Sequence, residues 1–180
     1  MTPPLTPPPV GVIGAGAVGQ SVAMLLAAGG WCESVRIVSR TGLSAQTLVT
    51  DLEDMCQVTA SSVRAVHVTD AGQLASCEAV VVCPRGDFTN TARTDIRMAS
   101  PNANIPVIAG LARKLAHYQG LVVMVTNPVD VLTRLFAEVS GCPHVYGVGS
   151  NTDTARPPHT CPPLGRAPTG RERPRDRRAR

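Results

Sequence analysis

Val10-Gly11-Val12-Ile13-Gly14-Ala15-Gly16-Ala17-Val18-Gly19 is the stretch of sequence that decides the fold. Four residues typical of a short buried strand lead into the pattern G-x-G-x-x-G, and an Ala- and Leu-rich stretch with helical character follows over 17–28. Between a strand and a helix, Gly14 permits a tight turn, Gly16 allows close approach to the backbone, and Gly19 lets the helix pack closely on the strand.

The glycine-rich turn predicts a site for the pyrophosphate of a dinucleotide. The N-terminus of the following helix offers backbone N–H donors and the positive end of the helix dipole, and both favour phosphate. We assign cofactor binding to the whole turn: Gly14, Ala15, Gly16, Ala17, Val18 and Gly19. The alternative is an Ala/Gly-rich tight turn in a fold that binds nothing.

Strand and helix patterns alternate through the rest of the first 150 residues. Strand patterns recur at 35–38, 63–68, 78–83, 121–125 and 145–146, by alternation at 63–68 and as a fully buried run at 78–83. A helical pattern occurs at 43–56. After a polar segment at 84–104, a second runs through Leu111, Leu115 and Tyr118, and a third runs from Pro128 to about 139. The alternation predicts an α/β fold: a Rossmann-type, doubly wound, six-stranded, mostly parallel sheet with helices on both faces. Right-handed crossovers would bring the carboxyl ends of the first and fourth strands together.

Composition divides the chain into four parts. Residues 1–9 hold five prolines and form a stiff leader, and residues 10–150 form the predicted dinucleotide-binding domain. Residues 151–156 begin a substrate-binding region. Residues 157–180 are rich in Pro and Arg, and we expect them to be disordered.

Charge and hydropathy exclude several classes of partner. The net charge of +4 is located in the tail, where seven Arg face two acidic residues. The domain itself is therefore not basic, and no aromatics accompany the arginines, so we expect no nucleic-acid partner. No apolar run is long enough to cross a membrane. Six cysteines without a Cys-x-x-Cys pair and without a signal peptide indicate reduced thiols in the cytoplasm and no metal site.

The residues after the second strand bear on which dinucleotide is preferred. An Asp or Glu there would bind the ribose hydroxyls of NAD, but this chain has Ser39-Arg40-Thr41, and no carboxylate follows until Asp51. A hydroxyl and a guanidinium can bind a 2′-phosphate. Ser39 and Arg40 are therefore candidate cofactor residues, and both NAD and NADP remain open. The alternative is that Arg40 simply faces solvent.

The second half of the domain resembles the lactate/malate dehydrogenase family. Val125-Thr126-Asn127-Pro128-Val129-Asp130 resembles its T-N-P-V-D signature, and Ser140-Gly141-Cys142-Pro143 resembles its S-G-x-P turn. Gly147-Val148-Gly149-Ser150 resembles its G-x-G-S segment, and Asp51-Leu52 its D-L pair. The similarity spans 10–156. It implies an oxidoreductase that transfers a hydride between a 2-hydroxy acid, such as lactate or malate, and a nicotinamide dinucleotide. This chain would supply the NAD(P)-binding N-terminal domain, and the intact family forms homo-oligomers.

The resemblance also implies roles for individual residues around the substrate. Arg156 matches the arginine that grips the substrate carboxylate, and Asp153 matches the aspartate that orients the catalytic histidine. Arg93 matches the loop arginine that polarises the carbonyl, and Arg85 lies near the specificity position, where an arginine favours a dicarboxylate. The alternative for Arg93 and Arg85 is that they are surface charges on a solvated loop. The alternative for Asp153 and Arg156 is that they form an exposed i, i+3 pair that contributes little.

Two asparagines complete the candidate site. Asn127 matches the asparagine that touches both substrate and cofactor, with capping of the following helix as the alternative. Asn104 is expected to approach the cofactor.

The glycine-flanked Glu-His-Gly segment that carries the family's catalytic histidine is not present in this sequence. Because the resemblance stops at Arg156, where the composition also changes, we interpret the chain as truncated by a frameshift there. A natural short protein with a basic tail is the competing hypothesis. In either case we expect poor turnover, and a catalytically silent dinucleotide-binding protein is the alternative function.

Overall fold

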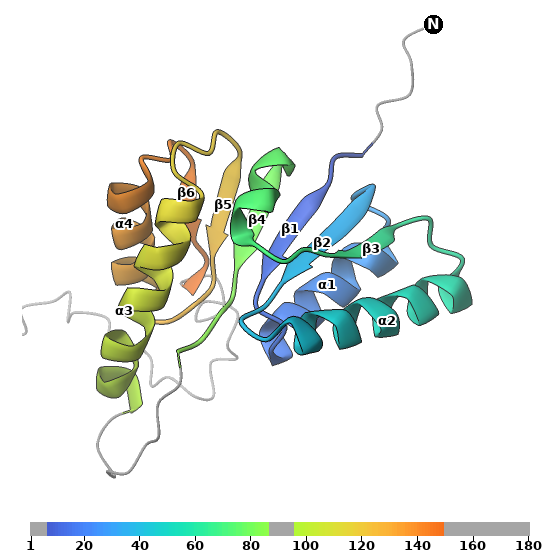
Figure 1. The fold of residues 1–180 in the computed structure, drawn as a ribbon, viewed down its shortest axis with the longest axis horizontal. Helices are drawn as coiled ribbons and strands as arrows, with labels where there is room; N and C mark the ends of the chain where they lie inside the picture. The colour runs from blue at the N-terminus through green and yellow to red at the C-terminus, as the bar shows by residue number, and fades with distance from the viewer. Residues whose placement is uncertain (1–6, 87–95, 150–180) are drawn as a thin grey trace, which may run out of the picture.

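The computed structural model describes residues 7–86 and 96–149 and contains one parallel sheet with helices around it (Figure 1). The strands are β1 (Val10–Ile13), β2 (Ser34–Val38), β3 (Arg64–His67), β4 (Ala79–Val82), β5 (Leu121–Met124) and β6 (Val145–Gly147). The helices are α1 (Ala17–Gly29), α2 (Gly42–Thr59), the 3₁₀ helix η1 (Ala71–Ser76), α3 (Ile96–Lys114) and α4 (Val129–Ser140). The six-stranded sheet has the order β3-β2-β1-β4-β5-β6. This order confirms the predicted doubly wound fold.

β1 lies at the centre of the sheet, between β2 and β4. Ile13 pairs with Val38 on one side and with Val82 on the other, and all five strand pairs are parallel rather than mostly so. The chain runs outward from β1 to β3 and then returns to β4 on the other side. The carboxyl ends of β1 and β4 therefore meet at the switch point of the sheet, as predicted.

Two hydrophobic clusters cover the two faces of the sheet. Val12 belongs to a cluster built with α1 and α2, whereas Ile13 belongs to one built with α3 and α4. Because adjacent residues of a strand point to opposite faces, these clusters lie on opposite sides of the sheet. The first cluster uses Ala23 and Ala27 of α1, so the helix packs closely on the strands without aromatic side chains.

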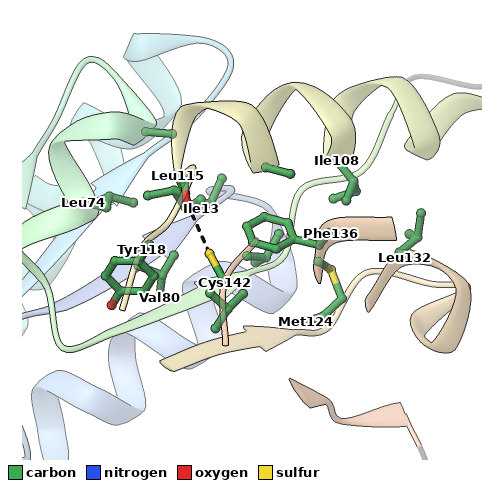
Figure 2. Close-up of a cluster of buried hydrophobic side chains, with 14 of the residues drawn as sticks. Ile13, Leu74, Val80, Ile108, Leu115, Tyr118, Met124, Leu132, Phe136 and Cys142 are labelled. Carbon is green, nitrogen blue, oxygen red and sulfur yellow. Dashed lines mark hydrogen bonds between the residues drawn. The ribbon is translucent and has the colours of Figure 1, made fainter. Parts of the chain in front are cut away.

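The second cluster is the larger core (Figure 2). Phe136 of α4 is fully buried and packs there with Ile108 of α3, Leu115 directly after α3, and Met124 of β5. Cys142 belongs to the same cluster, and its thiol donates a 3.3 Å hydrogen bond to the Leu115 carbonyl. The apolar face of α4 therefore packs against Met124 at the end of β5, three residues before Asn127.

Glycines end two of the helices, α1 and α4. Gly30 caps α1 with φ 64°, and Gly141 caps α4 with φ 67°. Both backbones lie in the left-handed region, which glycine adopts without a Cβ penalty.

The region around α3 corrects the sequence-based prediction in three ways. The sequence predicts a polar segment at 84–104 ahead of the helix, yet α3 begins at Ile96 within that segment and continues through Pro106. Tyr118 was placed on that helix but lies beyond its end at Lys114. The 3₁₀ helix η1 was not predicted at all. Its capping box, formed by Asp70 and Gln73, explains why this short turn is ordered.

Candidate functional site

The glycine turn gives each of its three glycines a distinct structural role. Gly14 has φ +104°, and a Cβ there would lie 3.0 Å from the Pro84 nitrogen. The chain that follows β1 therefore passes close to the backbone that follows β4. A Cβ on Gly19 would lie 1.8 Å from the Gly14 carbonyl oxygen. By contrast, a Cβ on Gly16 would have no atom within 4 Å. The turn therefore leaves open space at Gly16, where a ligand can approach the backbone.

The open side of the turn is the N-terminus of α1. Gly16 is the N-cap residue, no side chain caps the helix, and the first turn carries no acidic residue. Gly16, Ala17 and Val18 are exposed, whereas Ala15 and Gly19 are buried behind them. Orphan N–H groups and the positive dipole end thus face accessible space, which fits a pyrophosphate.

Backbone hydrogen bonds hold the strand ends in line around this turn. The Gly14 nitrogen donates to the Val38 carbonyl at 2.8 Å, and the Cys83 nitrogen donates to the Ile13 carbonyl at 2.9 Å. The ladder between β4 and β5 continues in the same way, from Val125 to Val82. The residues that follow β1, β2, β4 and β5 therefore lie along a single edge of the sheet.

At the end of β2, Ser39 and Arg40 lie beside the start of α2. The Ser39 hydroxyl is 2.8 Å from the Ser44 hydroxyl, and the Ser44 hydroxyl is in turn 2.7 Å from that of Thr41. Arg40 is exposed. No carboxylate occurs over residues 34–50. The end of β2 therefore presents hydroxyls and a guanidinium where an NAD site usually has an acid.

At the ends of β4 and β5, two side chains connect the loops. Asn104 of α3 is 2 % exposed; its Oδ1 accepts a 2.7 Å hydrogen bond from the Gly86 nitrogen, and its Nδ2 donates a 2.8 Å bond to the Asn127 carbonyl. The Thr126 hydroxyl donates to the Pro84 carbonyl at 2.7 Å. Asn127 itself is exposed and precedes a cis peptide bond to Pro128, which is the N-cap of α4 rather than its first residue.

The structure therefore brings together one part of the predicted site. The glycine turn, Ser39, Arg40, Arg85, Asn104 and Asn127 all come from the carboxyl edge of the sheet or the helix beside it. Arg85 is exposed and lies two residues before position 87. Arg93, Asp153 and Arg156 lie outside the described residues, so their predicted roles stay predictions.

Sequence reasoning missed two features of this edge. Gln20 directly follows the glycine turn, and its Nε2 donates a 3.1 Å hydrogen bond back to the Ala15 carbonyl. The second feature is Thr126, whose hydroxyl connects the ends of β4 and β5 through its hydrogen bond to the Pro84 carbonyl. The position of Gln20 one residue after the turn was a usable signal. The Thr126 contact depends on a proline 42 residues away, and no sequence pattern indicates it.

Other chemistries have little support in the part of the chain that the structure describes. There, no group of three or more His, Cys, Asp or Glu side chains is placed to hold a metal ion. Within the same residues, no helix is both long and apolar enough to span a bilayer.

An open glycine turn at the switch point of a doubly wound sheet defines a dinucleotide-binding domain. Residues 9–148 match the family model of the lactate/malate dehydrogenase NAD binding domain, so the chain belongs to the lactate/malate dehydrogenase family. The fit is consistent with the residues present: Gly16 leaves the space that a dinucleotide phosphate needs.

Curated relatives support this assignment. An L-lactate dehydrogenase from Chloroherpeton thalassium is 32% identical over 151 residues, which cover 82% of this chain and 48% of that protein. A malate dehydrogenase from Sulfurimonas denitrificans is 30% identical over 152 residues, covering 82% of this chain and 46% of that protein. The chain thus spans about half the length of the curated relatives that it matches.

Solved structures share the fold. The lactate dehydrogenase of Cryptosporidium parvum, in complex with lactic acid and nicotinamide adenine dinucleotide, has a TM-score of 0.69 at 22% identity, covering 77% of this chain and 44% of that one. The apo malate dehydrogenase of Picrophilus torridus has a TM-score of 0.72 at 21% identity, covering 81% and 46%.

Proposed function

We propose that this chain is the cofactor-binding half of an oxidoreductase that interconverts a 2-hydroxy acid and a 2-oxo acid, with lactate or malate as the substrate. The observation that carries the proposal is the open approach to Gly16 at the N-terminus of α1. It lies in a domain that belongs to the lactate/malate dehydrogenase family over residues 9–148. The cofactor is a nicotinamide dinucleotide, which when bound supplies the hydride acceptor and donor.

Residues after different strands would bind different parts of the cofactor. The backbone N–H groups at Gly16, Ala17 and Val18 would hold the pyrophosphate, because they lead the exposed N-terminus of α1. Asn127 would orient the nicotinamide half and the substrate from the end of β5. Its backbone is held in place for this by the hydrogen bond from Asn104 to its carbonyl.

The substrate side of the proposal rests on residues assigned by family resemblance. Arg156 would grip the substrate carboxylate bidentately, and Arg93 would stabilise the negative charge that develops on the carbonyl oxygen. Asp153 would orient a histidine that moves the hydroxyl proton. Arg85 would favour a second carboxylate and thus malate over lactate. A cytoplasmic location and a homo-oligomeric assembly belong to the same proposal.

Binding and turnover of the 180-residue chain test the proposal together. NADH fluorescence is titrated with the folded chain, and NADH consumption is then followed with pyruvate and with oxaloacetate. We expect binding with slow turnover, because the Glu-His-Gly segment is not present in this sequence. The residual consumption should be faster with oxaloacetate, an effect that Arg85→Gln should reduce. Binding without any consumption would favour a catalytically silent dinucleotide-binding protein. A folded chain that does not bind NADH would contradict the proposal.

A further inference from the structure

We infer that Gln20 is a positioning residue for the pyrophosphate of the bound dinucleotide, because its side chain sets the direction of the Gly16 N–H. The inference rests on the proposed function and concerns the same glycine turn. Gln20 is the fourth residue of α1 and directly follows the last glycine of the turn. It is exposed, so its side chain is not held against the turn by burial.

Gln20 holds two successive carbonyl groups of the turn. Its backbone nitrogen donates a 2.9 Å hydrogen bond to the Gly16 carbonyl, and its Nε2 donates a 3.1 Å bond to the Ala15 carbonyl. A carbonyl oxygen only accepts, so the amide nitrogen of Gln20, and not its amide oxygen, faces Ala15. The first bond is a backbone bond that any residue except proline can form. The second bond depends on the glutamine side chain.

The bond to the Ala15 carbonyl also fixes the Gly16 N–H, because these two groups are the ends of one peptide. The peptide between Ala15 and Gly16 is trans, so its carbonyl and its N–H point in opposite directions within one plane. With the carbonyl turned toward Gln20, the N–H points away from Gln20. Gly16 is exposed, and its nitrogen donates to no acceptor among the described residues. The N–H is therefore available to a phosphate oxygen.

Gly16 itself restrains the direction of this peptide only weakly. Ala15 is fixed at one end, because it is buried in the cluster that α1 and α2 form with the sheet. At the other end, a Cβ on Gly16 would meet no atom within 4 Å, and a glycine without a Cβ accepts many values of φ. Rotation of the peptide plane between the two Cα atoms would turn the N–H away from the ligand. The hydrogen bond from Gln20 opposes this rotation.

Calorimetric titration of NADH into the 180-residue chain measures the effect on binding. Gln20→Met keeps the length of the side chain and removes the donor. Its NADH affinity should fall about threefold to tenfold, which corresponds to the net contribution of one neutral hydrogen bond. Gln20→Glu places an acceptor against the Ala15 carbonyl, so its loss should be larger. Gln46→Met, the same substitution at an exposed position of α2, is the matched control and should leave the affinity unchanged.

Nitrogen-15 relaxation of the Gly16 amide separates positioning from a purely structural role. In the ligand-free wild type its order parameter should be close to about 0.85, the value of rigid backbone, and in Gln20→Met it should fall toward about 0.6. The amide of Ala23, a buried residue of the same helix, should keep its order parameter in both proteins. The urea midpoint should also stay close to that of the wild type, because Gln20 is exposed.

The outcomes separate this inference from the proposed function. Wild-type NADH affinity in Gln20→Met overturns the positioning role and leaves the dehydrogenase proposal intact. A lower affinity with an unchanged Gly16 order parameter also overturns it, because Gln20 then acts by another route. A lower affinity with loss of order at Ala23 as well overturns it too, since the substitution then loosens the whole helix. A folded wild-type chain that binds no NADH overturns both.

Discussion

The carboxamide nitrogen of Asn104 donates a 2.8 Å hydrogen bond to the backbone carbonyl of Asn127, which connects α3 to the loop after β5. The carboxamide oxygen of the same side chain accepts a hydrogen bond from the Gly86 nitrogen after β4. One buried side chain thus holds two loops at the carboxyl edge of the sheet. We conclude that Asn104 acts on the site by positioning Asn127, in addition to any approach to the cofactor itself.

Asn104→Ala should destabilise the domain and weaken NADH binding. It leaves the buried Gly86 N–H without this partner, which costs about 1–3 kcal/mol of the free energy of unfolding. It also removes the part-buried hydrogen bond to the Asn127 carbonyl. Asn102→Ala, at an exposed position of the same helix, is the control and should be close to neutral. Urea denaturation measures the stability, and NADH titration measures the affinity. Equal stability of the two variants would show that Asn104 has no such role.

Gly19→Ala and Gly16→Ala should differ sharply in stability. The added methyl group of Gly19→Ala would meet the Gly14 carbonyl oxygen at 1.8 Å, so α1 must move off β1. Overpacking of this kind costs about 1–3 kcal/mol or more. The methyl group of Gly16→Ala meets no atom within 4 Å, and its cost should stay below about 1 kcal/mol. Thermal melts of both variants measure this contrast, and similar melting temperatures would refute the close packing.

Phe136→Ala should be among the most destabilising core substitutions. Phe136 is fully buried between α3, α4 and β5 (Figure 2), and truncation of a buried phenylalanine costs about 3–5 kcal/mol. Val131→Ala on the same helix removes an exposed side chain and should change stability by less than about 0.5 kcal/mol. Urea midpoints of the two variants give the comparison. A small loss for Phe136→Ala would mean that this cluster is loosely packed.

Stability should fall at alkaline pH. Burial raises the pKa of the Cys83 thiol from 9.0 to about 11, and burial also raises the pKa of the Tyr118 phenol. Well below pH 9, the ordinary pKa of a cysteine thiol, both groups are protonated in the folded and unfolded states. Above pH 9 the unfolded chain loses these protons first, so it binds fewer protons and the free energy of unfolding declines with pH. Urea titrations between pH 7 and about pH 11 measure the decline.

The double variant Cys83→Ala, Tyr118→Phe provides the control for this pH dependence. Its free energy of unfolding should decline less steeply between about pH 9 and pH 11 than that of the wild type. Identical slopes for the two proteins would assign the alkaline decline to other groups.

The sequence predicted the parts of the fold that depend on local patterns. All six strands follow from apolar runs, and the ends of α1 and α4 follow from glycine stops at Gly30 and Gly141. The neighbouring positions of β1 and β4 follow from the crossover rule. The sequence does not predict the start of α3 at Ile96. Polar residues and two prolines obscure its pattern, and the helix forms because Ile108 and Ala112 pack into the core around Phe136.

The same division applies to the site. The glycine turn could be predicted because the positions of its glycines depend on the local geometry of a turn between a strand and a helix. The contacts of Asn104 and Thr126 could not, because their partners are 18 to 44 residues away and meet only in the folded sheet. The roles of Arg93, Asp153 and Arg156 depend on family resemblance and stay predictions.

Calorimetric titration of NADH and NADPH into the wild-type chain and into Gly16→Val tests the central claim most directly. The substitution adds a side chain to an exposed N-cap residue with φ −80°, so Gly16→Val should keep the circular dichroism spectrum of the wild type. We predict that the wild type binds at least one of the two dinucleotides and that Gly16→Val binds it at least about tenfold more weakly, because the side chain fills the space that the phosphate needs. A folded wild-type chain that binds neither dinucleotide, or equal binding by both proteins, would contradict the account.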